Sequence, residues 1–89
     1  MATIKEKIET YCVENEIKAL FADGYDEAIV GLGVCFHSYK VIYNKSKVLE
    51  ILARDMSQEE AIEFFEFNVV GAYVGDETPI FIEDLDLIY

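Results

Sequence analysis

Apolar residues at helical spacing open the chain. They recur at positions i, i+4, i+7 and i+8, on Ile4, Ile8, Tyr11 and Cys12. This spacing predicts an amphipathic helix, because it places the apolar side chains on one face. Thr3 and Glu6 stand three residues apart, as in a capping box, and Asn15 is a suitable last residue. The sequence therefore predicts a helix between Thr3 and Asn15.

Two apolar segments in the middle of the chain predict an antiparallel β-hairpin. The first runs from Ala28 to Phe36 and the second from Tyr39 to Tyr43, with His37 and Ser38 between them. Alternation along the first segment predicts a core face and an opposite, glycine-rich face. The expected core face carries Val30, Leu32, Val34 and Phe36, and the other face carries Ile29, Gly31, Gly33 and Cys35. Before the hairpin, Asp23–Asp26 reads as a turn, and Ile17–Phe21 fits either a short strand or a helical turn.

Two further helices are predicted after the hairpin. Asn44 is suited to cap the first of them, which ends near Asp55. Its apolar stripe consists of Val48, Ile51 and Leu52. Ser57-Gln58-Glu59-Glu60 has the spacing of a second capping box. The helix that it opens is expected to run to about Val74, with Gly75 as its C-cap.

Thr78–Ile82 reads as the last strand. Pro79 lacks a donor N–H, so this strand is expected at the edge of the sheet. The predicted element order is α-β-β-α-α-β. A chain of 89 residues has no room for two independent cores. We therefore expect an α+β fold in one small domain, residues 1–89, with an antiparallel sheet and helices packed on one face.

The chain is strongly acidic. Its 18 Asp and Glu residues outnumber its 7 Lys and Arg residues and give a formal net charge of −11, while 53% of its residues are hydrophobic. The hydrophobic content argues against intrinsic disorder. The charge argues against direct binding to nucleic acid or to an anionic membrane surface, because both need clustered Lys and Arg. It favours an electropositive partner. Arg54 is the last basic residue, and ten acidic residues follow it.

The cysteines and the N-terminus favour a cytoplasmic protein. Cys12 and Cys35 are too few for a disulfide framework, and their apolar neighbours predict two reduced thiols in the core. The first residues lack the basic-then-apolar order of a signal peptide. The longest apolar run, Ala28–Phe36, is too short to span a bilayer.

The third predicted helix carries the most informative pattern. At about 100° per residue, its expected core face carries Ala61, Ile62, Phe65, Val69 and Ala72. Glu59, Glu63 and Glu66 fall on the opposite side, and Phe67 and Val70 project among them. An apolar anchor surrounded by charge is typical of a protein-binding surface. Two alternatives remain open: the helix ends near Glu66 and Phe67 begins a buried strand, or this face is the seam of a homodimer.

Regularly spaced carboxylates also allow a sharper interpretation, that of a DNA mimic. The acidic residues that could imitate a row of phosphates are Glu59, Glu63, Glu66, Asp76, Glu77, Glu83, Asp84 and Asp86. Duplex DNA carries one charge about every 1.7 Å of its axis, whereas carboxylates one helical turn apart are sparser. A solvated face that keeps the protein soluble explains the same pattern.

Patterns typical of catalysis or of metal and cofactor binding are weak. His37 is the single histidine, and Cys35 could share its side of the strand, but no pattern places a nucleophile beside a base. Two cysteines and one histidine give no zinc spacing, and Asp23–Asp26 does not match a calcium loop. We expect no enzymatic activity, no metal and no cofactor. The alternative function is a small-ligand or nucleotide-binding module that uses Asp23, Asp26, Gly31 and Gly33.

Two stretches resemble a family of small acidic proteins encoded by tailed bacteriophages. They are Leu20–Gly31 and Phe65–Phe81, and the second contains the fairly specific string Phe-Asn-Val-Val-Gly-Ala-Tyr-Val-Gly. The resemblance assigns no role to particular residues. It implies that the protein acts by occupying a host protein, with host-defence nucleases and nucleic-acid-binding complexes as typical electropositive targets.

The leading hypothesis is therefore a protein that binds a basic host protein through an acidic surface. Its expected contact residues are Glu59, Glu63, Glu66, Phe67 and Val70, with a rim of Asp76, Glu77, Asp84 and Asp86. A homodimer with no further partner is the other alternative to the ligand-binding module.

Overall fold

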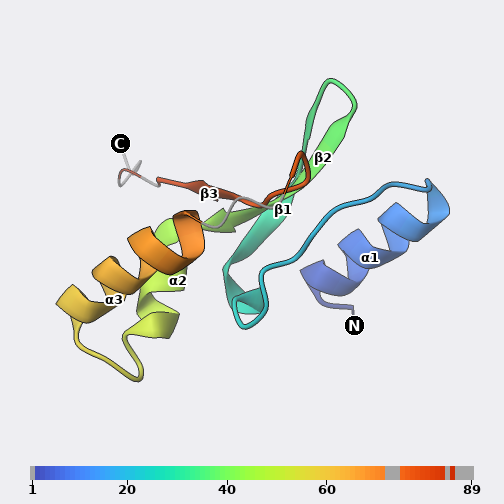
Figure 1. Ribbon diagram of the computed structural model, residues 1–89. Helices are drawn as coiled ribbons and strands as arrows, with labels where there is room; N and C mark the ends of the chain where they lie inside the picture. Colours follow the sequence, from blue (N-terminus) through green and yellow to red (C-terminus); the bar gives the residue numbers. More distant parts are fainter. Residues whose placement is uncertain (1, 72–74, 84, 86–89) are drawn as a thin grey trace.

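The predicted order of helices and strands is confirmed, with a short 3-10 turn and a π-helical segment in addition. The computed structural model describes residues 2–71, 75–83 and 85. Its elements are α1 (Ile4–Glu14), η1 (3-10, Asp26–Ala28), β1 (Ile29–Cys35), β2 (Ser38–Asn44), α2 (Lys45–Leu52), α3 (Gln58–Phe64), η2 (π-helix, Phe65–Val70) and β3 (Ile80–Ile82) (Figure 1). Residues 17–22 form neither a strand nor a helical turn and have no regular secondary structure.

β2 is the central strand of a three-stranded mixed sheet. β1 and β2 form the predicted antiparallel hairpin, in which Leu32 lies opposite Val41. β3 is a terminal strand, as predicted, but it begins at Ile80, after Pro79, and not at Thr78. It runs parallel to β2, with Phe81 opposite Tyr43. The expectation of an entirely antiparallel sheet is therefore wrong. The chain crosses back through α2 and α3 before it enters β3, and such a crossover is what parallel neighbours require.

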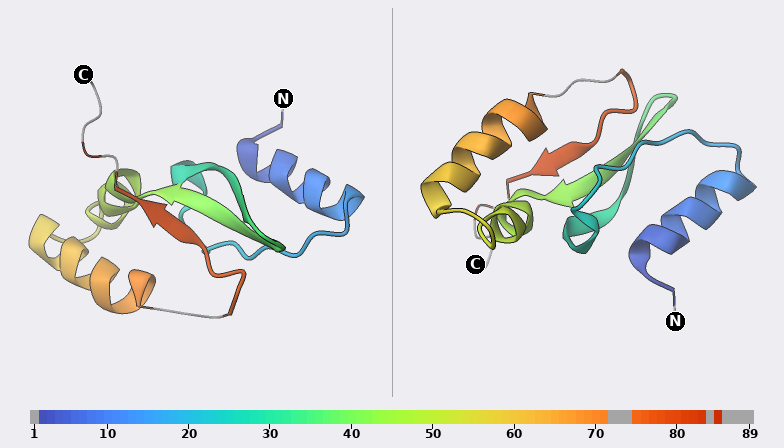
Figure 2. Two further views of the ribbon diagram at one scale, coloured as in Figure 1. Left: turned by 90° about the horizontal axis from the view of Figure 1, so that it is seen from above. Right: turned by 60° about the horizontal axis from the view of Figure 1, so that its bottom comes forward.

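The helices pack around the sheet, with α1 on the side of β1 and α3 on the side of β3 (Figure 2). Val41 and Tyr43 of the central strand β2 are 0% exposed. They form one buried cluster with Ile8 of α1, Val48 of α2 and Phe65 of η2. Elements from the whole described chain therefore share a single core.

The predicted helix caps are confirmed. In α1, the Thr3 hydroxyl accepts the Glu6 N–H at 3.1 Å, and the Glu6 carboxylate accepts the Thr3 N–H at 2.8 Å. Asn15 is the C-cap of this helix. At the start of α2, Asn44 Oδ1 accepts the Lys47 N–H at 2.9 Å. Each cap satisfies backbone donors that the helix itself leaves unpaired.

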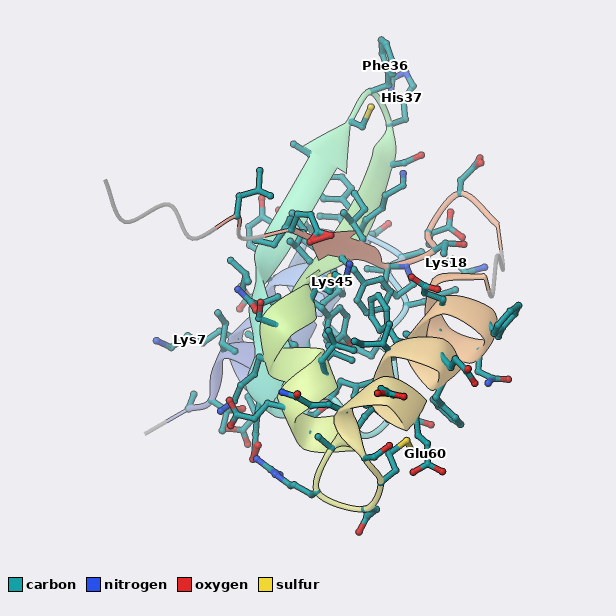
Figure 3. All side chains as sticks on the ribbon, turned by 90° about the vertical axis from the view of Figure 1, so that its left-hand side faces the viewer. Lys7, Lys18, Phe36, His37, Lys45 and Glu60 are labelled. Atoms are coloured by element: carbon teal, nitrogen blue, oxygen red, sulfur yellow. The ribbon has the colours of Figure 1, made fainter. Side chains whose placement is uncertain are left out.

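The two faces of β1 differ from the prediction. Ile29 is buried in the core, whereas Val30, Val34 and Phe36 are exposed, Phe36 by 95%. The strand register shifts at Val30, and this β-bulge interrupts the alternation that the prediction assumed. Of the four residues on the predicted core face, Leu32 packs against the core. Val34 still borders a hollow beside α1, although it is 63% exposed. Beyond Val34 the hairpin extends past the helices, and Phe36 lies at its tip (Figure 3).

The two cysteines occupy different environments. Cys12 is half-buried against the core, and burial raises the pKa of its thiol. Cys35 is exposed at the end of β1, so the expectation of a core thiol is wrong there, because the hairpin has left the helix layer by this point. Both thiols are free. None of the described helices is long and apolar enough to cross a membrane.

Candidate partner-binding surface

α3 begins at the predicted second capping box. The Ser57 hydroxyl accepts the Glu60 N–H at 3.1 Å, and Glu60 Oε1 accepts the Ser57 N–H at 3.0 Å. Hydrogen bonding to Ser57 lowers the pKa of Glu60. The larger effect comes from the Ser57 backbone and the smaller one from its side chain. The cap orders the first turn, from which Glu59 emerges into solvent.

The third helix ends earlier than predicted and in a different geometry. It is α-helical to Phe64 and π-helical over Phe65–Val70, and Gly71 rather than Gly75 is the C-cap. Residues 72–74 of the expected helix lie outside the described residues. A Cβ at Gly71 would approach the Phe67 carbonyl oxygen to 3.3 Å, so glycine suits this close helix end. π-helical turns are rare and frequently occur at functional sites.

Two phenylalanines of η2 lie in opposite environments. Phe65 is 2% exposed and packs edge-on against Phe81, with ring centroids 5.3 Å apart. Phe67 is 79% exposed, as the helical projection predicted. The alternative that Phe67 begins a buried strand is wrong, because the segment is helical and its side chain is in solvent.

The predicted core face of this helix is confirmed in part. Ala61 and Phe65 are buried, and Val69 is half-buried against the core. Ile62 is 46% exposed, because it borders a shallow hollow between α2 and α3 instead of the sheet. Ala72 lies outside the described residues.

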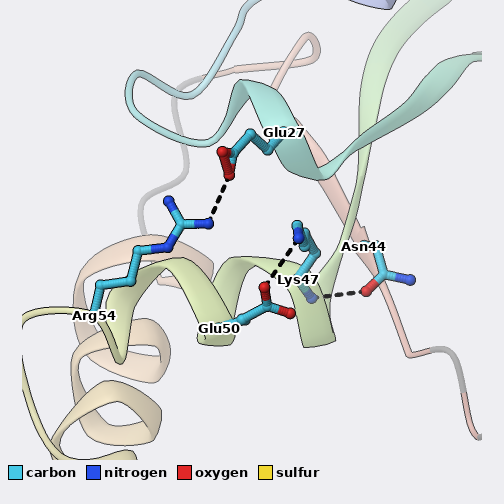
Figure 4. Close-up of polar contacts among 5 residues, drawn as sticks. All are labelled: Glu27, Asn44, Lys47, Glu50 and Arg54. Atoms are coloured by element: carbon cyan, nitrogen blue, oxygen red, sulfur yellow. Dashed lines mark hydrogen bonds and ion pairs between the residues drawn. The ribbon is translucent and has the colours of Figure 1, made fainter.

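The carboxylates beside Phe67 are not neutralised. Glu59, Glu63 and Glu66 are exposed, and none forms an ion pair with another described residue. Arg54, the last basic residue before them, is held by Glu27 at 2.8 Å on the far side of α2 (Figure 4). This hydrogen bond and the guanidinium charge lower the pKa of Glu27. The negative charge on α3 and η2 therefore faces solvent.

The expected rim is only partly available. Asp76 is exposed and Glu77 is half-buried. Glu83, which belongs to the predicted phosphate-like row and not to this rim, binds Lys45 at 2.6 Å. The side chain of Val70 and the whole of Asp84 and Asp86 lie outside the described residues.

Two hollows flank Phe64 and Asn68, which line both of them. The larger has a volume of 490 Å³ and aromatic and aliphatic walls, among them Leu20, Phe21, Tyr25, Val69 and Phe81. The smaller has a volume of 350 Å³ and is bordered by Met56, Glu60, Glu63 and Phe67. Sequence reasoning missed Phe64, although it stands three residues before Phe67 and therefore on the same side of a helix.

The residues of the ligand-binding alternative have other contacts. Asp23 and Asp26 are exposed, and Asp26 lies 3.4 Å from the Lys5 ammonium. A Cβ on Gly33 would lie 2.7 Å from Ile42 Cδ1, so the Ile42 side chain occupies the space above this glycine. Nothing lies within 4 Å of a Cβ on Gly31. The described residues contain no group of three side chains suited to hold a metal ion.

Cys35 and His37 flank Phe36 at the hairpin tip. Both are exposed. No hydrogen bond orients the imidazole toward the thiol among the contacts of the described chain. The tip therefore presents an exposed aromatic ring and not an assembled nucleophile and base.

Comparison with known proteins identifies no relative. The chain matches no family model, no curated protein and no solved structure. The resemblance to small acidic phage proteins therefore stays a prediction.

Proposed function

We propose that this protein acts by binding an electropositive protein through the exposed side of α3 and η2. This acidic aromatic face consists of Met56, Glu59, Glu60, Glu63, Phe64, Glu66 and Phe67. The observation that carries the proposal is the exposure of Phe67, at 79%, among carboxylates that no described cation neutralises. The resemblance to phage proteins implies that this partner is a host protein.

The arrangement combines the two elements of a specific interface. Aromatic residues are enriched among the few side chains that dominate binding energy, because they bury a large apolar area. The surrounding carboxylates steer a basic partner toward the surface and repel acidic proteins. Phe67 is the expected anchor, and Glu59, Glu63 and Glu66 are the expected steering charges.

The two related interpretations fit this surface less well. A homodimer through the same face would place the carboxylates of one copy against those of the other, and such like charges repel. Imitation of a phosphate row needs a denser series of charges than one per helical turn. Glu83, a member of the expected row, is already paired with Lys45.

A pull-down from bacterial lysate with matched variants tests the proposal. The test variant carries Phe67→Ala and Glu63→Lys. The control carries an equivalent pair of changes on α1, the apolar truncation Val13→Ala and the charge reversal Glu14→Lys, because Val13 is 78% exposed and Glu14 is exposed. Capture is compared at about 50 mM and about 200 mM NaCl, since added salt screens exposed charges.

We expect the wild type and the control to retain a basic protein at low salt and to lose much of it at higher salt. The test variant should lose it at both, because truncating a central aromatic anchor costs about 2 kcal/mol or more, or about 30-fold in affinity. Equal capture by the test variant would place the interface elsewhere on the molecule.

A further inference from the structure

The larger hollow beside the acidic aromatic face is a second, apolar surface. Its walls come from three segments that are distant in sequence: the linker between α1 and β1, the end of the third helix, and β3 with its preceding residues. Its volume of 490 Å³ lies within the range of ligand pockets, and no Asp, Glu, Lys or Arg lines it. It suits an uncharged, apolar group.

Contacts behind the hollow hold its walls in place. The Tyr43 hydroxyl accepts the Ala22 N–H at 2.7 Å and fixes the linker to the central strand. Phe81 stacks on Tyr43 with ring centroids 5.4 Å apart, and it meets Phe65 edge-on at 5.3 Å. A binding surface supported in this way needs little ordering when it is occupied, which favours affinity.

The apolar hollow and the acidic one are immediate neighbours. Phe64 and Asn68 line both, and these residues stand one helical turn apart on the same helix. On the far side of them, Glu60 and Glu63 border the smaller hollow. A group that spans the pair therefore meets apolar walls at one end and carboxylates at the other.

The surrounding charge decides the class of occupant. Anionic metabolites are repelled by Glu60 and Glu63 and by a chain of net charge −11. Exposed Phe67 extends the contact surface beyond the two hollows. A cationic segment of a protein, with an apolar side chain beside its charge, matches all of these features.

We infer that the larger hollow receives an aliphatic or aromatic side chain of the partner, three or four positions from a Lys or Arg that contacts Glu60 and Glu63. This inference rests on the proposed function and specifies its partner: a basic, amphipathic segment and not a merely basic surface. Side chains three or four apart on a helix lie about 5–6 Å apart, which is close enough to straddle Phe64 and Asn68.

Selection from a random library of 12-residue peptides on the immobilised full chain tests the inference. Enriched peptides should pair Leu, Ile, Phe or Trp with Lys or Arg at this spacing. The strongest peptide is then synthesised, and its affinity is measured by fluorescence anisotropy against two matched variants. Ala22→Leu fills the apolar hollow, and Ala53→Leu makes the same change in the hollow between α2 and α3.

Ala22→Leu should weaken peptide binding about 10-fold or more, the value of one buried aliphatic side chain, and Ala53→Leu should leave it unchanged. Replacing the apolar residue of the peptide by Ala should weaken binding to the wild type but not to Ala22→Leu. As a check that does not depend on a variant, the methyl NMR signals of Leu20 and Val69 should shift when the peptide is added.

The outcomes separate this inference from the proposed function. Enrichment of basic peptides without an apolar preference, with unmoved Leu20 and Val69 methyl signals, overturns the inference and leaves the acidic aromatic face as a charge-selective site. Enrichment of neutral or acidic peptides, or of none, overturns both.

Discussion

At the scale of single residues, Tyr43 connects the core to the candidate site. It is 0% exposed, its ring stacks on Phe81, and its hydroxyl accepts the Ala22 N–H. Burial raises the pKa of Tyr43, and the nearby charges of Asp26 and Asp23 raise it further, while the hydrogen bond from Ala22 lowers it. The neutral phenol is therefore the form that the fold stabilises.

Tyr43→Phe should lower the free energy of unfolding by about 1–3 kcal/mol, because it leaves the Ala22 N–H without its acceptor. The pH dependence should change as well. Since the folded-state pKa lies above the unfolded value of about 10, the stabilisation is fully present below pH 10 and is lost as the pH rises through the folded-state pKa. Urea unfolding between about pH 8 and 11 should show a steeper loss for wild type than for Tyr43→Phe.

Tyr11→Phe is the matched control, because Tyr11 is 48% exposed. It should leave the free energy of unfolding unchanged. An equal effect of the two substitutions would mean that the Tyr43 hydroxyl contributes nothing specific to the fold.

Single positions also show what local pattern can and cannot predict. The exposure of Phe67 followed from a helical projection, because the apolar residues spaced three and four apart define which face of the helix is buried. The exposure of Phe36 did not, because it depends on where the hairpin leaves the helix layer. Phe36 has φ of 55°, a conformation that its residue type does not indicate.

At the scale of elements, signals within a few residues predicted structure best. Both capping boxes and the cap of α2 are confirmed because each depends on residues three apart. On β1, the bulged residue at Val30 shifts the alternation of the strand, so Ile29 and not Val30 lies in the core, the reverse of the prediction. The direction of β3 and the π-helical geometry of η2 depend on partners elsewhere in the fold, so periodicity could not predict them.

Ser57→Ala tests whether the order of α3 matters for binding. It removes the hydroxyl that accepts the Glu60 N–H and should cost about 1 kcal/mol of stability. The fold lowers the pKa of Glu60. The ionised Glu60 carboxylate therefore stabilises the fold at pH values above its unfolded-state pKa, and this stabilisation is lost as the pH falls through its folded-state pKa. Ser57→Ala keeps the backbone N–H that is the larger cause of this lowered pKa and removes only the side-chain contribution. Thermal unfolding of the variant should therefore lose part, but not all, of this pH dependence between about 3 and 6.

Thr3→Ala removes the equivalent cap of α1 and serves as the control. We expect a similar loss of stability from both variants, but weaker peptide binding only from Ser57→Ala, because only its frayed turn carries Glu59 and Glu60. Equal affinities would show that the cap supports the helix and not the acidic aromatic face.

At the scale of the whole molecule, the charge is divided between two regions. From Ala28 to Leu49 the chain contains three Lys and no Asp or Glu, and this stretch forms β1, β2 and most of α2. The acidic residues lie on the segments before and after it. The candidate site thus lies where electrostatic repulsion within the fold is concentrated. This arrangement lowers stability, and under the proposed function it attracts a basic partner.

Charge reversal should therefore separate stability from binding. Glu63→Lys with Glu66→Lys changes the net charge from −11 to −7, since each reversal adds two positive charges. At about 20 mM NaCl, where repulsion is least screened, the melting temperature should rise by about 4–8 °C for about 1 kcal/mol of relieved repulsion. The same variant should lose binding of the basic peptide.

Glu9→Lys with Glu14→Lys makes the same charge change on α1. It should raise the melting temperature comparably and retain the peptide, because its charges lie outside the acidic aromatic face. In both variants the gain should shrink at about 500 mM NaCl as screening removes the repulsion. A lower melting temperature for Glu63→Lys with Glu66→Lys would instead mean that these carboxylates stabilise the fold, and their exposure would then need no partner to explain it.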